Sequence, residues 1–312
     1  MINININIEQ NTILKNINRK EINKMNINYN TQIYCLIGHP ISKTLSPIIH
    51  NNFYRLINEN NIYLAFDVKE KYLSTIVEAI KILDIKGFNI TIPYKTTVIN
   101  YLDEISEEAK LIGAVNTVKN VDGKLVGYNT DGMGFIKSLE LNNIDVKGKN
   151  ILVLGAGGGA KAIGTSLALA EVNSIFISNR TLGKAKKLSE KLKYQFPKVS
   201  IDYGGLDLKK IDKKKIHMII NCTSIGMYPN IDKSPIDLDG FSKDLVVYDI
   251  VYKPINTKLL KLAQDKGYKT MDGLTMLIFQ GLYSQQIWLD NKNYDIYEYY
   301  DEIRRNLEKY VE

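Results

Sequence analysis

The stretch that decides the fold runs from Asn150 to Gly164 and reads NILVLGAGGGAKAIG. Its first five residues form an apolar run typical of a buried strand, and a glycine-rich turn with the spacing G-x-G-x-x-A leads directly into a small-residue helix. The first glycine permits a tight turn, the second lets the backbone approach a pyrophosphate, and the small third residue lets helix and strand pack closely. The helix N-terminus adds free N–H groups and a positive dipole. The pattern predicts a dinucleotide site formed by Gly155, Ala156, Gly157, Gly158, Gly159 and Ala160.

The type of dinucleotide is indicated by the residues after the next predicted strand, 174–178. A NAD site usually carries Asp or Glu about 20 residues beyond the glycines, where the carboxylate accepts from the ribose 2′-hydroxyl. This chain has Asn179, Arg180 and Thr181 there, so no carboxylate repels a 2′-phosphate and the Arg180 guanidinium can bind one. Such a charged hydrogen bond contributes about 1.5–3 kcal/mol, or roughly tenfold to hundredfold discrimination. We therefore expect NADP rather than NAD.

Strands and helices alternate on both sides of this stretch, which predicts an α/β fold with mainly parallel sheets covered on both faces. A length of 312 residues suggests about two domains. Apolar runs predict strands at 33–37, 63–68, 87–92, 150–154, 174–178, 218–220 and 245–249. The sequence also predicts helices that begin at Ser46, as N-cap, and at 72–83, 97–102, 132–143 and 182–192, with a hairpin turn at Asp122-Gly123.

The composition excludes several classes of protein. Hydrophobic residues make up 45% of the chain, too many for a wholly disordered one. Two cysteines, Cys35 and Cys222, cannot build a disulfide framework or a four-cysteine zinc site, and the three histidines lack metal-ligand spacing, so we expect no metal site. No apolar run reaches the about 18 residues of a membrane span. Residues 1–30 are rich in Asn, Ile and Lys and lack an export signal, which favours a cytoplasmic location.

Polar residues gather where the strands of the first half end. These segments are GHPISKTLSP at 38–47, NITIPYK at 89–95, GAVNT at 113–117 and YNTDG at 128–132. Each residue taken singly has a structural explanation: Ser46 or Asp131 caps a helix, Lys95 lies on the surface, and Asn116 forms a turn. In open α/β sheets, however, the loops at the carboxyl ends of the strands line the ligand crevice.

Taken together and in order, these motifs resemble the shikimate dehydrogenase family. The resemblance continues through NCTSIG at 221–226, YDIVYKP at 248–254 and DGLTMLIFQG at 272–281, and it covers about residues 31–290. It implies NADPH-dependent reduction of 3-dehydroshikimate to shikimate, a step of aromatic amino-acid biosynthesis. It also implies two α/β domains that flank a cleft, one for the substrate and one Rossmann-like domain for NADP.

The resemblance divides the chain into four parts. Residues 1–30 are expected to be a disordered or weakly ordered extension, and residues 31–131 the substrate-binding catalytic domain. Residues 132–271 are expected to form the NADP-binding domain. Residues 272–312 are expected to form C-terminal helices that return to the substrate domain. A small-molecule substrate, no nucleic acid, no membrane, and a monomer or homodimer are the partners expected.

The resemblance also assigns roles to residues. Lys95 and Asp131 are implied as the catalytic pair, in which the lysine donates a proton when the ketone is reduced and the aspartate orients it. Whether Lys95 is also the base in the oxidation is open. The residues implied to hold the substrate are Thr44, Ser46 and Tyr252 at its carboxylate and Thr91, Asn116 and Gln280 at its ring hydroxyls. Those implied to bind NADP, besides the glycine-rich turn, are Asn179, Arg180 and Thr181, with Thr223, Gly273 and Met276 at the nicotinamide.

Three alternatives remain open from the sequence. The first of the two loop serines of the family is Thr44 here, and its extra methyl group leaves quinate possible as a substrate, with NAD or NADP. A non-catalytic NADP-binding regulatory module would bind the nucleotide without turnover. A nucleic-acid binder is suggested by the net charge of +7 and the lysine run at 209–215, but that run lacks interleaved aromatic residues.

Overall fold

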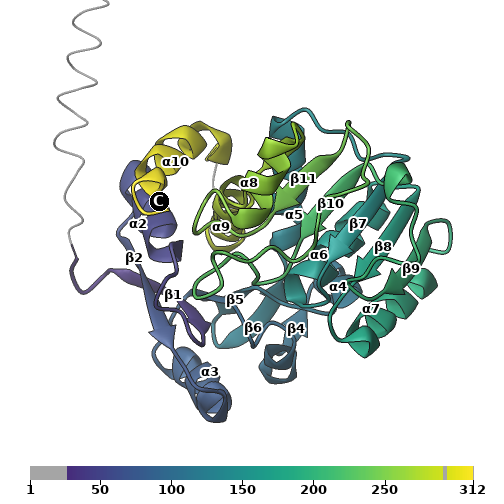
Figure 1. Ribbon diagram of the computed structural model, residues 1–312. Helices are drawn as coiled ribbons and strands as arrows, with labels where there is room; N and C mark the ends of the chain where they lie inside the picture. The colour runs from purple at the N-terminus through teal and green to yellow at the C-terminus, as the bar shows by residue number, and fades with distance from the viewer. Residues whose placement is uncertain (1–26, 291–293, 312) are drawn as a thin grey trace, which may run out of the picture.

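The computed structural model describes residues 27–290 and 294–311 (Figure 1). The predicted N-terminal extension, residues 1–30, lies outside the described residues except for 27–30. Two six-stranded sheets form the framework, and helices pack around both. Within the described ranges, no helix has the length and apolar character that crossing a bilayer requires.

The second sheet carries the glycine-rich turn and is parallel throughout. Its strands are β7 (Asn150–Leu154), β8 (Ser174–Ser178), β9 (Ser200–Gly204), β10 (Met218–Asn221), β11 (Val246–Asp249) and β12 (Lys269–Met271). They pair in the order β9-β8-β7-β10-β11-β12, and every pair is parallel. This is the strand order 3-2-1-4-5-6 of doubly wound dinucleotide-binding sheets, whose ligand crevice opens where the order reverses, here between β7 and β10.

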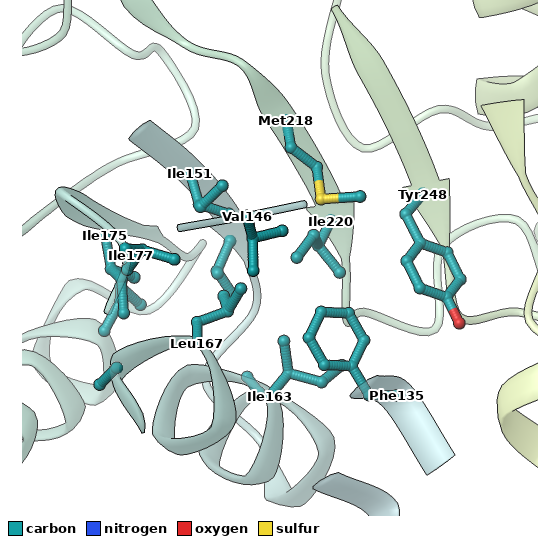
Figure 2. Close-up of a cluster of buried hydrophobic side chains, with 14 of the residues drawn as sticks. Phe135, Val146, Ile151, Ile163, Leu167, Ile175, Ile177, Met218, Ile220 and Tyr248 are labelled. Atoms are coloured by element: carbon teal, nitrogen blue, oxygen red, sulfur yellow. The ribbon is translucent and has the colours of Figure 1, made fainter. Parts of the chain in front are cut away.

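Both faces of this sheet are covered. Its helices are α5 (Asp131–Leu141), α6 (Gly158–Leu169), α7 (Leu182–Gln195) and α8 (Lys258–Asp265), with a 3₁₀ turn η3 (Lys213–Lys215). Alternate residues of each strand point to opposite faces. Figure 2 shows one face, where Ile151, Ile177 and Ile220 point toward Ile163 and Leu167 of α6. The other face packs on α8 and on apolar side chains of the long connecting loops.

The first sheet is mixed: three of its five strand pairs are parallel and two are antiparallel. Its strands are β1 (Gln32–Gly38), β2 (Asn61–Asp67), β3 (Gly87–Ile90), β4 (Glu104–Ile105), β5 (Thr117–Val121) and β6 (Lys124–Tyr128). The order is β2-β1-β3-β5-β6-β4, in which β1 is parallel to β2 and β3 while β5 is antiparallel to β3 and β6. The predicted turn at Asp122-Gly123 is confirmed: both residues have positive φ, as a two-residue hairpin requires.

The first domain's helices correct two predictions. They are α2 (Ser46–Leu56), η1 (Glu70–Tyr72), α3 (Leu73–Ile82), η2 (Thr97–Tyr101) and α4 (Glu107–Ile112). The N-cap of α2 is Leu45, so the expectation for Ser46 is wrong: Ser46 is the first helical residue and its hydroxyl caps nothing. Pro47 follows it in the first turn. Backbone N–H groups of the first turn make no hydrogen bond within the helix, so the missing N–H of proline costs nothing there. The segment predicted as a helix at 97–102 is a 3₁₀ turn.

The C-terminal helices are α9 (Leu274–Trp288), η4 (Ile296–Tyr299) and α10 (Tyr300–Glu308). Helix α9 lies against α5 and reaches the first sheet, where the indole of Trp288 donates to the carbonyl of Val118 at 2.9 Å. Helix α10 lies beside α2 (Figure 1). The last helices therefore pack on the first domain, although they follow the second in the chain.

The contact between α5 and α9 depends on Gly134. A Cβ there would lie 2.8 Å from the backbone nitrogen of Gln280 and 2.8 Å from the backbone oxygen of Met276. We expect Gly134→Ala to push the helices apart and to lower the free energy of unfolding by about 1–3 kcal/mol in urea denaturation. Gly183→Ala is the matched control, since nothing lies within 4 Å of its Cβ position and alanine favours the helix. Equal stability of the two variants would contradict this packing argument.

Candidate active site

An ion pair joins Lys95 and Asp131. Lys95 follows the end of β3, and Asp131 is the first residue of α5. The Lys95 Nζ lies 2.5 Å from Oδ2 of Asp131, and the two side chains are 18% and 7% exposed. The structure thus brings together two residues that are separated by 36 positions and were singled out separately in the sequence. Partial burial strengthens such a pair because little water screens it.

Asn116 fixes the second oxygen of the Asp131 carboxylate. Its amide nitrogen donates to Asp131 Oδ1 at 2.8 Å, and its amide oxygen accepts from the backbone N–H of Thr130 at 2.8 Å. Gln280 lies next to it, with its Oε1 3.4 Å from the same amide nitrogen. The two carboxylate oxygens therefore have different partners, and the Lys95 ammonium can occupy one position only.

A cavity of about 380 Å³ opens between the two domains. From the first domain it is lined by Thr44 and Thr91, and from the second by Tyr252. Ser46 is buried behind Thr44, whose hydroxyl donates to the Ser46 hydroxyl at 3.2 Å. Burial raises the pKa of Tyr252, so its phenol stays neutral and can donate a hydrogen bond at neutral pH. Most of the remaining lining is apolar, and Lys43 and Lys253 are its charged residues.

A buried polar layer beneath the site was not assigned from the sequence. The Tyr63 hydroxyl donates to the side-chain oxygen of Asn89 at 2.8 Å. The Asn89 amide donates to the hydroxyls of Thr117 and Ser284 at 3.0 and 3.1 Å. It also donates to the carbonyl of Asn116, so this layer supports the residue that holds Asp131. Asn89 stands in the motif NITIPYK, but nothing in a single sequence separates a buried asparagine from an exposed one.

The glycine-rich turn has the geometry a dinucleotide needs. Gly155 has a φ of +112°, and a Cβ on it would lie 3.0 Å from the carbonyl oxygen of Cys222, across the point where the strand order reverses. Gly157 is the N-cap of α6 and offers no side-chain cap, so the first-turn N–H groups are open to a phosphate. The Cβ position of Gly158 lies 3.2 Å from the Lys95 side chain. The turn therefore lies beside the aliphatic part of the Lys95 side chain.

The end of β8 suits a 2′-phosphate. The side-chain amide of Asn179 donates to the carbonyl of Thr181 at 2.9 Å and so holds the loop closed. Arg180 is exposed, and among the described residues it makes no ion pair. Its guanidinium is therefore available to a phosphate, and the chemistry of this donor set fits NADP.

Thr223 is held by a buried network that includes Asp249. The Thr223 hydroxyl donates to the side-chain oxygen of Asn221 at 2.7 Å, and the Asn221 amide donates to Asp249 Oδ1 at 2.9 Å. Thr257 and the backbone N–H of Val251 complete the shell of the carboxylate. Asp249 was not predicted from the sequence; the signal was a lone carboxylate at the end of the apolar run VVYDIV.

Gly273 and Met276 lie at the start of α9, beside the same network. A Cβ on Gly273 would lie 2.1 Å from the carbonyl oxygen of Ile250, so only glycine fits there. Met276 is in the first turn of α9 and is buried. The helix therefore begins against the loop that follows β11, at the carboxyl edge of the second sheet.

Comparisons with known proteins agree with this geometry. Residues 36–118 match the family model of the shikimate dehydrogenase substrate binding domain, and residues 138–226 match that of shikimate / quinate 5-dehydrogenase. A shikimate dehydrogenase (NADP(+)) from Caldanaerobacter subterraneus subsp. tengcongensis is 46% identical over 85% of this chain and 94% of its own. The chain belongs to the shikimate dehydrogenase family.

Solved structures of shikimate dehydrogenases have the same fold. One in complex with NADP+ has a TM-score of 0.81 at 41% identity and covers 90% of this chain and 97% of its own. The shikimate 5-dehydrogenase from Listeria monocytogenes, in complex with shikimate and NAD, also has a TM-score of 0.81, at 34% identity, and covers 89% of this chain and 98% of its own. The predicted two-domain α/β fold is confirmed.

The Asp249 carboxylate makes stability depend on pH. Burial raises its pKa to about 6, and hydrogen bonds from Thr257, Val251 and Asn221 offset part of that rise. A raised folded-state pKa means that the folded protein binds the proton more tightly than the unfolded chain does. The contribution of Asp249 to folding stability is therefore present at low pH and is lost as pH rises through 6. We expect the free energy of unfolding of Asp249→Asn, relative to that of the native protein, to increase by about 1 kcal/mol from pH 5.0 to pH 7.5, as measured by urea unfolding. A stability difference that is the same at both pH values would contradict it.

Proposed function

We propose that this protein catalyses the NADP-dependent, reversible reduction of 3-dehydroshikimate to shikimate, a step of aromatic amino-acid biosynthesis. The observation that carries the proposal is the Lys95–Asp131 ion pair, whose lysine side chain runs beside Gly158 of the dinucleotide turn. A pair in that position can serve a carbonyl group next to the cofactor. The names of the relatives, which are NADP-dependent shikimate dehydrogenases, support it.

The division of labour between protein and cofactor follows from the chemistry. Bound NADPH supplies the hydride for the ketone carbon. The Lys95 ammonium donates the proton that the ketone oxygen gains, and the return of that proton to Lys95 accompanies the oxidation of the alcohol. Asp131 orients the ammonium, and Asn116 holds Asp131. General acid–base help of this kind contributes roughly 10²–10⁴-fold.

Neutral groups are proposed to hold the substrate. Thr44, Ser46 and Tyr252 would donate hydrogen bonds to its carboxylate. Thr91, Asn116 and Gln280 would bind its ring hydroxyls. A site built from hydroxyl and amide groups rejects analogues that lack the matching hydroxyl, because its own polar groups are then left unpaired. The lining of the cavity by Thr44, Thr91 and Tyr252 supports their part of this assignment, while Asn116 and Gln280 lie beside Asp131 instead.

The domains take their roles from these residues. We assign substrate binding to residues 31–131, NADP binding to residues 132–271, and packing on the substrate domain to the helices of 272–312. Within the NADP-binding part, the proposed contacts are the turn from Gly155 to Ala160, the phosphate-binding group Asn179, Arg180 and Thr181, and the nicotinamide-lining group Thr223, Gly273 and Met276. A cytoplasmic location and a monomer or homodimer stay predictions.

Absorbance at 340 nm tests the function directly. With shikimate and NADP+, we expect NADPH to form, and with NAD+ in place of NADP+ we expect kcat/KM to fall at least about tenfold, because Arg180 has no 2′-phosphate to bind. Quinate is the second substrate to test, since Thr44 leaves it open. A higher kcat/KM with quinate would make the protein a quinate dehydrogenase. Nucleotide binding without turnover of either acid would indicate a regulatory module instead.

Replacement of the lysine tests the catalytic pair. We expect Lys95→Ala to reduce kcat at least about a hundredfold while KM for shikimate changes less than about fivefold, because the lysine acts on the reacting oxygen rather than on the carboxylate. Lys110→Ala is the matched control, since Lys110 is an exposed lysine of the same domain. Unchanged turnover in the Lys95 variant would refute the assignment.

A further inference from the structure

Two residues from opposite domains meet above the cavity. Lys43 lies in the loop between β1 and α2, one residue before Thr44, and Tyr228 lies in the loop between β10 and β11. The Lys43 Nζ sits over the Tyr228 ring, 3.2 Å from its centroid. A cation over the face of an aromatic ring is attracted by the ring quadrupole. In the described part of the chain, Lys43 makes no ion pair with a carboxylate that would compete for it.

The exposure of Lys43 and Tyr228 places their contact at the mouth of the cavity. Both Lys43 and Tyr228 line the cavity, yet both are exposed, and Tyr228 is 67% exposed. Thr44, Thr91 and Tyr252 line the same cavity and are only partly exposed, so they lie deeper. A molecule that enters between the two loops therefore passes Lys43 and Tyr228 before it reaches the hydroxyls.

We propose that Lys43 and Tyr228 form a gate that closes the substrate cavity by joining the two domains. The inference rests on the proposed function, because it takes this cavity as the substrate site. The Lys43–Tyr228 contact is of modest strength, so the gate opens readily for entry and release, and the contact favours the closed arrangement by about two- to fivefold. Its effect is on how long the substrate stays, not on the chemical step.

Kinetics of paired variants test the gate. We expect Lys43→Gln and Tyr228→Leu each to raise KM for shikimate about two- to fivefold, with kcat within twofold of the native value. The double variant should be no worse than either single variant, because both remove the same contact. Lys43→Arg and Tyr228→Phe keep a cation and a ring, so they should retain the native KM. Lys233→Gln is the matched control, as it removes an exposed charge from the same loop without lining the cavity.

Two kinetic outcomes would overturn the gate. A raised KM in Lys43→Gln together with a native KM in Tyr228→Leu would show that Lys43 acts only as a charge on the anionic substrate, and the gate would be wrong. Additive effects in the double variant would also overturn it.

A measurement without substrate separates the gate from the proposed function. In the ligand-free protein, we expect Lys43→Gln to speed amide hydrogen exchange in residues 226–231 and to leave β7 unchanged. If the protein fails to oxidise shikimate but this exchange does change, the function is wrong and the gate survives. If shikimate is oxidised and the exchange does not change, the gate is wrong and the function survives.

Discussion

The 2.5 Å ion pair between Lys95 and Asp131 is the interaction on which the site depends. Both groups are mostly buried, and a buried carboxylate without its cation is costly, so neither can be placed there alone. Gly158 lies beside the Lys95 side chain, and a Cβ there would be 3.2 Å from its Cδ. Residues 31–131 supply the lysine and the aspartate, while the second domain supplies the glycine-rich turn. The site exists only where the two meet.

The pair is held in place by a polar layer that runs through three parts of the chain. Asn116 from the first sheet binds Asp131, Asn89 binds the Asn116 carbonyl, and Ser284 of α9 binds Asn89. Buried amides and hydroxyls are costly unless each finds a partner. Because the partners come from β3, the β5 region and α9, the layer forms only when the C-terminal helix has returned to the first domain. The close approach of α9 to Gly134 of α5 is part of the same requirement.

Sequence reasoning was most successful where one short signal decides the structure. The strands β7 and β8 were predicted at their observed bounds, because continuous apolar runs stop sharply at the glycine turn and at Asn179. The edge strands β9 and β12 were missed, since SIDYG and KTM are short and half polar. The strand order of the first sheet was not predicted, because local patterns do not say which strands pair.

The candidate site was likewise predicted only in part. Lys95, Asp131 and Asn116 stand in motifs and were found, and the structure brings them together. Asp249 and the layer beneath Asn116 were not, because burial and partners are properties of the folded chain rather than of a residue type. Ser46 was misread as an N-cap, since a serine before a proline fits both a cap and the first helical turn.

Charge balance explains why the mouth of the cavity carries a cation. Lys95 and Asp131 neutralise each other, so the catalytic pair adds little net attraction for an anionic substrate. Thr44 and Tyr252, which lie deeper in the cavity, are neutral and in the proposed function act through short-range hydrogen bonds. The long-range attraction for a carboxylate must then come from the two lysines that line the cavity, the partly exposed Lys253 and the exposed Lys43, which lies where a substrate first arrives. The ring of Tyr228 beneath it holds that charge at the mouth without neutralising it, which a carboxylate partner would have done.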